Sequence, residues 1–509
     1  MKDSFDVIVV GSGTSGSVVA RRLLDAGQRV LVLEAGPEDS NPAIHDLSRA
    51  IELWGGPEDW NYRSVPQVHA HGAPVLLPRG KVLGGSYAFN GTIWTRGAAA
   101  DYEAWAADGN EGWSWADVEA QYQRIENWLG DASPGRGVGG PIDITDHYET
   151  SDLQLAITEA VTQTGLPLNA DYNSGSQEGV ARQQHTIRGG ERLTSYRAYL
   201  EPERANPLLT VRTGARVLRL IFGTGDRVIG VELDTGQGTE VVHAAETVVC
   251  AGAIDSPRLL LLSGIGDPAE LEAAGVTPQI GLSGVGRNLQ DHNVVLTIFE
   301  VERPMPMPVP GRAISSTHWF WRSNPELELP DTAPLAFDAP LYFPHMSGSF
   351  NAFTLGAGLI TPKSRGTIRL PSADPEDQPL IDLNAFADPD DLAVMARAIQ
   401  QCLDVAAAPA LAEGWGAKPV YPARESQSDL EEYARSALGS YHHPGGTCKM
   451  GPASDNDAVV DPQLRVHGVS GLRIADASIM PTISRGGTNA PCVMIGEQAA
   501  RFIVGDAVL

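Results

Sequence analysis

The sequence lacks the features that mark several classes of protein. It has 4 cysteines in 509 residues, and Cys250, Cys402, Cys448 and Cys492 lie far apart without any Cys-x-x-Cys pair. This spacing predicts reduced thiols in a cytoplasmic protein, and neither a disulfide framework nor a metal site. No apolar run approaches roughly 18 residues, so we expect no transmembrane helix. Residues 1–6 lead directly into a hydrophobic segment, which leaves no space for a signal or transit peptide.

Basic residues are also scarce relative to acidic ones. The chain has 37 Lys and Arg residues against 63 Asp and Glu residues, for a formal net charge of −26. Such a charge disfavours nucleic acid and anionic membrane surfaces as partners. We interpret the acidity as a source of solubility, with steering of a cationic substrate as the alternative. Hydrophobic residues make up 42% of the chain, which is enough for a large core.

A dinucleotide-binding turn is predicted near the start of the chain. Residues 7–10 are Val-Ile-Val-Val, as in a buried parallel strand, and they lead into a Gly-x-Gly-x-x-Gly pattern. Gly11 permits the tight turn, Gly13 lets a pyrophosphate approach the backbone, and Gly16 lets the following helix pack against the strand. A second apolar segment ends at Glu34, near the expected position of a carboxylate that binds a ribose diol. The ligand is therefore FAD or NAD, and this motif alone does not choose between them.

Further segments carry glycine beside polar residues. Residues 78–86, with residues 90–92 after them, place many backbone N–H groups around one concavity, which suits an anion or an electron-rich ring edge. Asp476 ends a predicted strand and suits a ribose or ribityl hydroxyl. The turn at residues 485–491 precedes an apolar helix, whose positive end could face a flavin ring. The remaining segments of this kind are residues 252–257 and residues 441–451.

Residues 441–451 contain two adjacent histidines, His442 and His443. In an extended chain successive residues point to opposite sides, so we expect only one of the two to face a site. No further metal ligand lies nearby at a suitable spacing, so we expect no metal centre.

The order of these patterns predicts an α/β protein with two domains. A Rossmann-like nucleotide-binding domain is expected from residues 1–145, 191–290 and 431–509, and a second, antiparallel-sheet domain covered by helices from residues 146–190 and 291–430. Apolar alternation predicts antiparallel strands at residues 208–211, 215–222 and 228–233, and strand-like runs at residues 337–345, 351–360 and 366–371. Helices are expected at residues 101–130, 152–165, 388–407 and 427–438, and at residues 256–262 with Pro257 near the first position. The proline-rich residues 303–312 predict a loop over an opening or a mobile linker.

The motifs together resemble the glucose–methanol–choline (GMC) family of FAD oxidoreductases. The resemblance spans nearly the whole chain, and it is nearest to the choline-dehydrogenase-like and hydroxymethylfurfural-oxidase-like branch. The matching segments are residues 11–16 with Glu34, residues 80–86 with Asn90, Gly91 and Thr92, and residues 252–266, 364–382, 443–450, 475–481 and 488–497.

The resemblance implies bound FAD and oxidation of an alcohol by hydride transfer to flavin N5. It implies that His443 is the catalytic histidine and Asn489 its partner. Residues implied in FAD binding are Gly11, Gly13, Thr14, Ser15, Gly16, Glu34, Ala35, Arg79, Val82, Gly84, Gly85, Ser86, Asn90, Gly91, Thr92, Val217, Ala251, Gly252, Asp476, Ala477 and Thr488. Some family members attach FAD through a histidine just before the Asn-containing turn. Residues 87–90 here are Tyr-Ala-Phe-Asn, so we expect noncovalent FAD.

The chemistry requires a group that takes the hydroxyl proton, and an ordinary imidazole pKa suits His443 for this at neutral pH. We expect His442 to face away from N5 and to pack or shape the pocket. Candidate pocket side chains are Trp94, His442, Trp319, Tyr342, Phe343 and Phe353. They favour an aromatic or otherwise apolar primary alcohol. No carboxylate can be placed for a quaternary ammonium group, so choline is not favoured.

Several alternatives remain at this point. The electron acceptor is O2, as in an oxidase, or a quinone or another carrier, as in a dehydrogenase. A redox-neutral family member, a hydroxynitrile lyase or a fatty-acid photodecarboxylase, is the alternative function. An NAD enzyme would leave the later glycine-rich segments unexplained. The substrate and the oligomeric state stay open.

Overall fold

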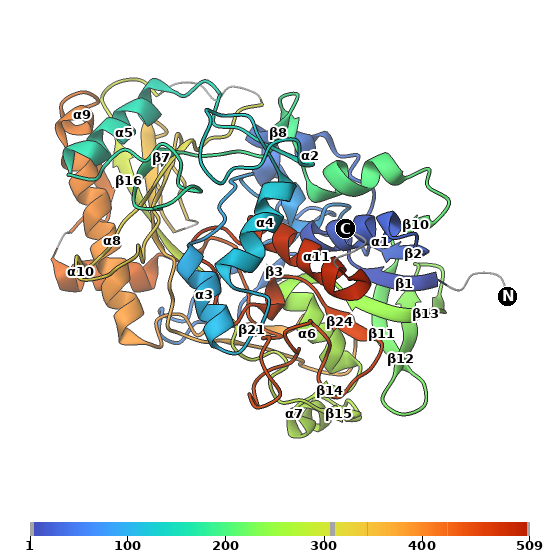
Figure 1. Cartoon of the computed structure of the whole chain (residues 1–509). Helices are drawn as coiled ribbons and strands as arrows, with labels where there is room; N and C mark the ends of the chain where they lie inside the picture. The colour runs from blue at the N-terminus through green and yellow to red at the C-terminus, as the bar shows by residue number, and fades with distance from the viewer. Residues whose placement is uncertain (1–4, 306–310, 344, 425, 506–509) are drawn as a thin grey trace.

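The computed structural model describes residues 5–305, 311–343, 345–424 and 426–505. In this part of the chain two seven-stranded sheets dominate, each with helices packed against it. Figure 1 shows the sheet with β1, β2 and β13 on one side of the molecule and the sheet with β7 and β16 on the other. This arrangement confirms the predicted combination of a mainly parallel sheet with an antiparallel second sheet.

The first sheet has the strand order β10-β2-β1-β13-β12-β11, with β24 beside β13. The strands are β1 (Phe5–Val10), β2 (Val30–Leu33), β10 (Leu209–Arg212), β11 (Arg216–Phe222), β12 (Val228–Asp234), β13 (Thr239–Val249) and β24 (Leu472–Ile474). β1, β2, β10, β13 and β24 run parallel to one another, whereas β11 and β12 form an antiparallel edge. The antiparallel prediction for residues 208–211 is therefore wrong: alternation shows which face is buried, but strand direction depends on the route by which the chain returns to the sheet.

Helices α1 (Thr14–Asp25) and α11 (Asn489–Val504) pack against each other beside this sheet. Helix α6 (Gly252–Leu262) begins earlier than predicted, so Pro257 lies inside the helix and not near its first position. Proline removes the N–H that would bond the carbonyl of Ala253. Thr447 Oγ1 donates to that carbonyl at 2.6 Å, which satisfies it.

The second sheet is antiparallel throughout, in the order β22-β16-β19-β18-β17-β7 with β23 beside β16. The strands are β7 (Gly179–Arg182), β16 (Asn293–Glu300), β17 (Thr317–Phe320), β18 (Leu335–Phe337), β19 (Ala352–Leu359), β22 (Lys418–Tyr421) and β23 (Leu438–Ser440). Helices α5 (Asp152–Gln163) and α8 (Pro389–Ala407) pack against it, and α10 (Gln427–Ser436) packs against α8. The run predicted at residues 337–345 is a strand only up to Phe337.

Each sheet has its own hydrophobic core. The first core uses side chains from residues 5–144, 193–285 and 448–499. The second uses side chains mainly from residues 153–180 and 295–437. The chain therefore passes from one core to the other and back, and the space between the two sheets is bordered by segments that lie far apart in the sequence.

The remaining elements are short and connect these layers. The helix predicted at residues 101–130 is divided, because Gly109 and Gly112 have φ values of +94° and +87° and break it. Residues 306–310 of the proline-rich segment lie outside the described residues. The short helices are α2 (Pro42–His45), η1 (Leu47–Leu53), η2 (Gly85–Ala88), α3 (Ala99–Ala107), α4 (Trp115–Ile125), η3 (Tyr196–Leu200), η4 (Glu201–Glu203), α7 (Pro268–Ala273), α9 (Pro409–Ala412) and η5 (Ala477–Ile479). The short strands are β3 (Tyr62–Arg63), β4 (Leu76–Leu77), β5 (Glu126–Trp128), β6 (Ile142–Ile144), β8 (Ile187–Arg188), β9 (Glu191–Arg192), β14 (Ile265–Gly266), β15 (Ile280–Gly281), β20 (Thr367–Arg369) and β21 (Leu380–Asp382).

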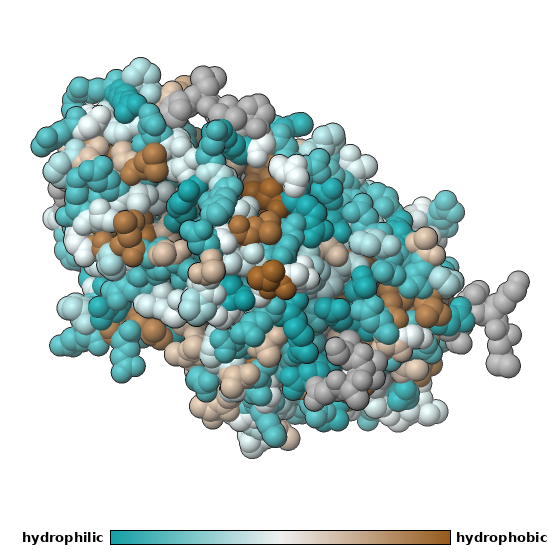
Figure 2. All heavy atoms as spheres, turned by 45° about the horizontal axis from the view of Figure 1, so that its top comes forward, coloured by the Kyte–Doolittle hydropathy of each residue, from teal (hydrophilic) through white to brown (hydrophobic). Residues whose placement is uncertain are grey.

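The surface in Figure 2 is mostly hydrophilic, with small separate hydrophobic patches. Within the described ranges, every helix is too short or too polar to cross a membrane. The same residues hold no group of three or more His, Cys, Asp or Glu side chains arranged to bind a metal ion.

Candidate active site

A cavity of about 930 Å³ lies between the two sheets. Its lining includes the loops that follow β1, β2 and β13, the start of α11, and the inner face of the second sheet. It therefore joins the predicted dinucleotide site to the predicted substrate pocket.

The turn after β1 has the geometry that its glycines predict. Gly11 has a φ of +97°, which favours glycine. A Cβ on Gly16 would lie 2.0 Å from the carbonyl oxygen of Gly11, so α1 packs directly on the turn. A Cβ on Gly85 would lie 2.8 Å from the Cα of Gly13, so two glycine-rich backbones meet at the cavity. Helix α1 begins at this point, with Gly13 as its N-cap, and the backbone N–H groups of a helix N-terminus suit a phosphate group.

Glu34 is held at the end of β2 by three hydrogen bonds. Its Oε2 accepts from the backbone N–H of Ser12 at 3.1 Å and from Ser12 Oγ at 2.7 Å, and its Oε1 accepts from the N–H of Gly36 at 2.9 Å. Burial raises the pKa of the carboxyl, and the hydrogen bonds from Gly36 and Ser12 oppose that shift. Both carboxylate oxygens keep lone pairs that can accept from ribose hydroxyls.

Asp476, which follows β24, is also held by three hydrogen bonds. Its Oδ2 accepts from the N–H of Gly252 at 2.9 Å and from Ser256 Oγ at 2.5 Å, and its Oδ1 accepts from the N–H of Ser478 at 2.8 Å. Burial raises the pKa of this carboxyl as well. Asp476 thereby ties the start of α6 to the end of β24 and lines the cavity.

Most residues expected to bind the cofactor line this cavity. Those that do are Gly11, Gly13, Thr14, Ser15, Glu34, Ala35, Arg79, Gly85, Ser86, Asn90, Gly91, Val217, Ala251, Gly252, Asp476, Ala477 and Thr488.

Four of the expected residues lie behind the lining. Gly16 is covered by the Gly11 turn, and Gly84 faces Thr194, whose Oγ1 would lie 3.3 Å from an added Cβ. Val82 packs in a small apolar cluster, and Thr92 Oγ1 is bonded to His185 Nδ1 at 2.9 Å. These four residues shape the backbone that the lining residues present.

His443 and Asn489 both line this cavity although they are 46 positions apart in the sequence. A Cβ on Gly487 would lie 3.5 Å from His443 Nε2, so the imidazole packs against the turn that leads into Asn489. Thr14 Oγ1 donates to Asn489 Oδ1 at 3.2 Å. This bond fixes the amide and leaves Asn489 Nδ2 buried without a partner.

His443 is held in place by contacts with Asp291 and His292. Its backbone N–H donates to Asp291 Oδ1 at 2.8 Å, and its Nδ1 lies 3.0 Å from His292 Nδ1 with the two rings at 88°. Burial, and then the charge of Arg79, lower the pKa of His443 to about 3. The ring is therefore neutral across the physiological range, with a lower pKa than the ordinary imidazole value assumed from the sequence.

His442 also lines this cavity, as a side chain that packs or shapes the pocket would, and its orientation away from N5 stays a prediction. Its φ is +63°, in the left-handed region, so the backbone is not extended there and the alternation of an extended strand does not apply. Trp54 meets its ring edge-on at 5.2 Å, and Arg79 Nη2 donates to its carbonyl at 2.7 Å. Burial, followed by Arg79, lowers the pKa of His442.

Three of the six candidate pocket side chains lie elsewhere. Tyr342 and Phe343 line the cavity, whereas Trp94, Trp319 and Phe353 do not. Trp319 Nε1 donates to Gln401 Oε1 at 2.9 Å, and Phe353 stacks on Phe299 at 5.2 Å, so both belong to the face of the second sheet that packs against helices.

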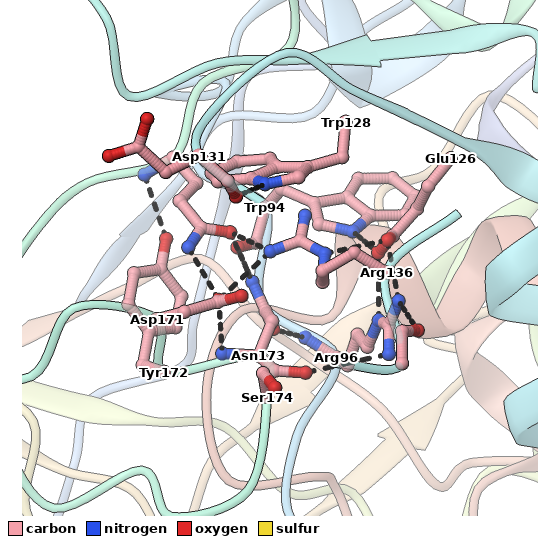
Figure 3. Close-up of polar contacts among 12 residues, drawn as sticks. Trp94, Arg96, Glu126, Trp128, Asp131, Arg136, Asp171, Tyr172, Asn173 and Ser174 are labelled. Atoms are coloured by element: carbon pink, nitrogen blue, oxygen red, sulfur yellow. Dashed lines mark hydrogen bonds and ion pairs between the residues drawn. The ribbon is translucent and has the colours of Figure 1, made fainter. Parts of the chain in front are cut away.

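Trp94 belongs to a buried ionic network (Figure 3). Its Nε1 donates to Glu126 Oε1 at 2.7 Å, and the same carboxylate accepts from Arg96 and from Arg136. Asn173 accepts from the N–H of Arg96 at 2.7 Å and donates to the carbonyl of Trp94 at 2.9 Å. The backbone on both sides of Thr95 is thereby fixed, and Thr95 lines the cavity. The network therefore supports the cavity wall from behind.

Comparison with known proteins agrees with the order of these elements. Two family models described as GMC oxidoreductase match residues 5–294 and 362–496. The chain belongs to the GMC oxidoreductase family. It is a flavoprotein oxidoreductase of the type that acts on CH–OH donors, and its fold combines an FAD-binding domain with a substrate domain.

The relatives of this GMC oxidoreductase cover its whole length. An uncharacterized GMC-type oxidoreductase of Mycobacterium tuberculosis is 38% identical over 99% of this chain and 100% of its own. An oxygen-dependent choline dehydrogenase of Brucella melitensis is 34% identical over 98% of this chain and 95% of its own. Among solved structures, pyridoxine 4-oxidase from Mesorbium loti has a TM-score of 0.93 and 33% identity, with 98% of this chain and 99% of that chain covered.

Some residues of this GMC oxidoreductase that line the cavity were missed from the sequence. Tyr87, Gln183, His292 and His318 are all buried and line it. His292 begins an alternating pattern with Val294 and Leu296 that could have been recognised as one face of a strand. Gln183 and His318 gave no comparable signal, because isolated polar residues near strands occur widely.

Proposed function

We propose that this GMC oxidoreductase oxidises a primary alcohol, aromatic or otherwise apolar, to the aldehyde with noncovalently bound FAD. The observation that carries the proposal is that His443 and Asn489 line one cavity together with the glycine-rich turns. A dinucleotide site alone would not require a neutral imidazole and an amide at its edge.

The residues present fit FAD. The Gly13–Gly85 approach suits the pyrophosphate, Glu34 suits the adenosine ribose, and Asp476 suits the ribityl–phosphate region. Tyr87, which lines the same cavity, offers a buried hydroxyl to the bound group. This fit supports FAD over a smaller ligand.

Attachment of FAD is proposed to be noncovalent. Residues 87–90 offer no histidine or cysteine. Cys492 lines the cavity, but burial raises the pKa of its thiol to about 12, so it stays protonated and a poor nucleophile. Acid precipitation should therefore release the yellow flavin into the supernatant, and colour retained by the precipitate would contradict this proposal.

When bound, FAD supplies the acceptor at N5 for a hydride from the carbinol carbon. The proposed task of His443 is to take the hydroxyl proton on Nε2. We assign a proton to Nδ1, donated to His292 Nδ1, because this tautomer leaves the Nε2 lone pair for the substrate. The low pKa of His443 is compatible with this task, since the hydroxyl becomes strongly acidic only as the carbon–hydrogen bond breaks.

Asn489 is proposed to orient the alcohol. Its Oδ1 is already occupied by Thr14, so Nδ2 is the atom that can donate to the substrate oxygen. The amide carries no charge and does not titrate in this range, so it positions the hydroxyl without competing for its proton.

The lining supports a neutral substrate. Among the described residues that line the cavity, the acidic ones are Glu34, Asp255 and Asp476. Asp255 accepts from Tyr62 Oη at 2.7 Å and from Arg258 Nη1 at 3.2 Å, and the other two are bonded as described above. No carboxylate is left over for a quaternary ammonium group, so we do not propose choline, despite the choline dehydrogenase relative. Tyr342, Phe343 and Phe337 favour an aromatic or aliphatic group.

Either O2 or another redox carrier is compatible with this proposal, and a cytoplasmic location remains a prediction. The test is anaerobic mixing of the purified holoenzyme with aromatic, aliphatic, sugar and amino alcohols while flavin absorbance is followed. We expect rapid bleaching by benzyl-type or aliphatic primary alcohols. Absence of bleaching by every alcohol would contradict the proposal and favour a redox-neutral activity, such as that of a hydroxynitrile lyase or a fatty-acid photodecarboxylase. Reoxidation of the bleached enzyme in air would distinguish an oxidase from a dehydrogenase.

A further inference from the structure

The inner face of the second sheet carries a small polar cluster, formed by Gln183, Ser315 and His318. All three line the cavity and are at least nine-tenths buried, with relative exposures of 0%, 8% and 3%. The alcohol chemistry proposed above uses none of them.

Strand register places Gln183 and His318 together. β7 and β17 pair with His318 opposite Ala181, and the N–H of Gln183 donates to the carbonyl of Ser316 at 2.9 Å. Gln183 follows Ala181 by two residues, so it lies on the same face as His318 and diagonally across from it. The sheet thus presents both side chains to one part of the cavity.

Each of these two side chains has a fully buried polar atom without a partner. Gln183 Nε2 donates to Ser315 Oγ at 2.7 Å and to the carbonyl of Thr317 at 3.3 Å, which leaves Oε1 unbonded. His318 lies between Tyr172 and Phe320, with ring centroids 4.4 Å and 5.1 Å away, and its Nε2 is also unbonded. Buried polar atoms are rarely left unpaired, because each costs about 1–3 kcal/mol.

The part of the cavity lining that the described residues in 311–360 contribute is uncharged. Between residues 311 and 360, none of the described residues that line the cavity is Asp, Glu, Lys or Arg. Burial, and then His185, lower the pKa of His318 to about 3, so its ring is neutral. A charged group brought here would lose its hydration without gaining a counter-ion.

We propose that Gln183 and His318 form a specificity subsite for a neutral hydroxyl at the far end of the alcohol substrate. That hydroxyl donates to Gln183 Oε1 and accepts from the N–H at His318 Nε2, so both unpaired atoms are satisfied. This inference rests on the proposed function, because it assigns the oxidised end of the substrate to His443.

A series of contacts across the second sheet leads from His443, at the oxidised end of the proposed substrate, to His318, at its distal end. The Tyr441 ring lies 6.0 Å from that of His443, and Tyr441 Oη donates to the carbonyl of Gly356 at 2.8 Å. Gly356 on β19 pairs with Leu335 on β18, and His318 on β17 is paired with Leu335 from the other side. Two strand spacings correspond to about 10 Å. The substrate that we propose is an elongated diol-like molecule, and its second hydroxyl should matter only at chain lengths that reach from His443 to this subsite.

The test compares 1,ω-diols of increasing length with 1-alkanols in which a methyl group replaces the distal hydroxyl. Binding is measured by calorimetry on anaerobically reduced holoenzyme, which cannot oxidise the ligand, and flavin reduction is measured separately on oxidised holoenzyme. One hydrogen-bonded hydroxyl should favour the diol by about threefold to tenfold at the lengths that span the cavity. Equal affinities at every length would overturn the proposal.

Variants test the two residues. His318→Phe keeps the ring packing and should abolish the diol preference, while His318→Gln should restore part of it because the Gln amide nitrogen can occupy the position of Nε2. Gln183→Glu should shift the preference to ω-amino alcohols. The control Leu335→Met, on the neighbouring strand, should change diol and alkanol binding alike.

The outcomes separate this inference from the proposed function. Diol discrimination that persists unchanged in both His318→Phe and Gln183→Glu would overturn the subsite. Flavin bleaching by alcohols without any diol preference would overturn the subsite and leave the proposed function intact. Diol discrimination in the reduced holoenzyme without bleaching by any alcohol would support the subsite and contradict the proposed oxidation.

Discussion

The contact between His292 and His443 gives the sharpest prediction of the account. His292 is fully buried, and its Nδ1 lies 3.0 Å from His443 Nδ1. A proton on His443 Nδ1 leaves Nε2 as the acceptor of the substrate proton. The hydrogen bond from His443 Nδ1 to His292 Nδ1 then strengthens when the His443 ring becomes cationic. Hydrogen bonds to charged groups contribute about 1.5–3 kcal/mol. Loss of the bond should therefore slow flavin reduction by roughly 10- to 100-fold.

Two substitutions separate this effect from general disruption. His292→Leu removes the acceptor. His292→Asn keeps it, because Asn Oδ1 takes the position of imidazole Nδ1. We expect the Leu variant to show the full loss in anaerobic stopped-flow reduction, with FAD still bound, and the Asn variant to stay within about fivefold of wild type. Equal rates in Leu, Asn and wild-type proteins would refute the reasoning.

The tautomer itself can be observed. In protein labelled with ¹⁵N-histidine, a bare ring nitrogen and an N–H nitrogen give distinct signals, and a His443→Gln variant assigns the relevant pair. The account predicts the proton on Nδ1 of His443. A signal showing the proton on Nε2 would contradict the assigned role, whatever the rates of the variants.

Three other predictions follow from the cofactor site and the core. Glu34→Gln should weaken FAD binding by about tenfold or more, because a charged acceptor is lost. Fluorescence titration of apoprotein measures this, and the exposed control Glu38→Gln should bind FAD as wild type does. Equal FAD affinities of Glu34→Gln and wild type would count against the ribose role of Glu34. Gly16→Ala should strongly reduce the yield of folded protein, since the new Cβ would lie 2.0 Å from the Gly11 carbonyl; a normal melting temperature would contradict that packing. Folded His318 has a pKa of about 3, so below about pH 6.5 the unfolded chain binds a proton that the folded chain does not. Between pH 6.5 and 4.5 the unfolding free energy of wild type should therefore fall relative to that of His318→Phe, with a slope that rises to about 1.4 kcal/mol per pH unit at the acidic end. Urea unfolding at both pH values checks this, and a pH-independent difference would show that His318 is not neutral in the fold.

The sequence predicts the local turns of the cofactor site well, because their chemistry is local. Gly11 needs a left-handed backbone and Gly16 needs a close helix, and both requirements act within a few residues. The pairing of His443 with Asn489 came from the family resemblance, since no local rule joins two segments that meet only after the chain has formed both sheets.

The errors have equally specific causes. Alternation does not tell which face of a strand packs against helices, so Trp319 was assigned to the pocket while its neighbour His318 lines it. His442 has a left-handed backbone conformation, so the alternation rule for an extended chain does not apply to this pair of histidines. The proline in α6 was tolerated because Thr447, far away in sequence, bonds the carbonyl that Pro257 leaves free.

The central claim is that a neutral His443 accepts the proton of an alcohol whose carbon is oxidised at bound FAD. The most direct measurement is the rate constant for anaerobic flavin reduction by a good alcohol substrate in His443→Ala with full FAD occupancy. The account predicts a decrease of about 10²- to 10⁴-fold, the usual contribution of a general base. Reduction at the wild-type rate in that flavin-loaded variant would contradict it.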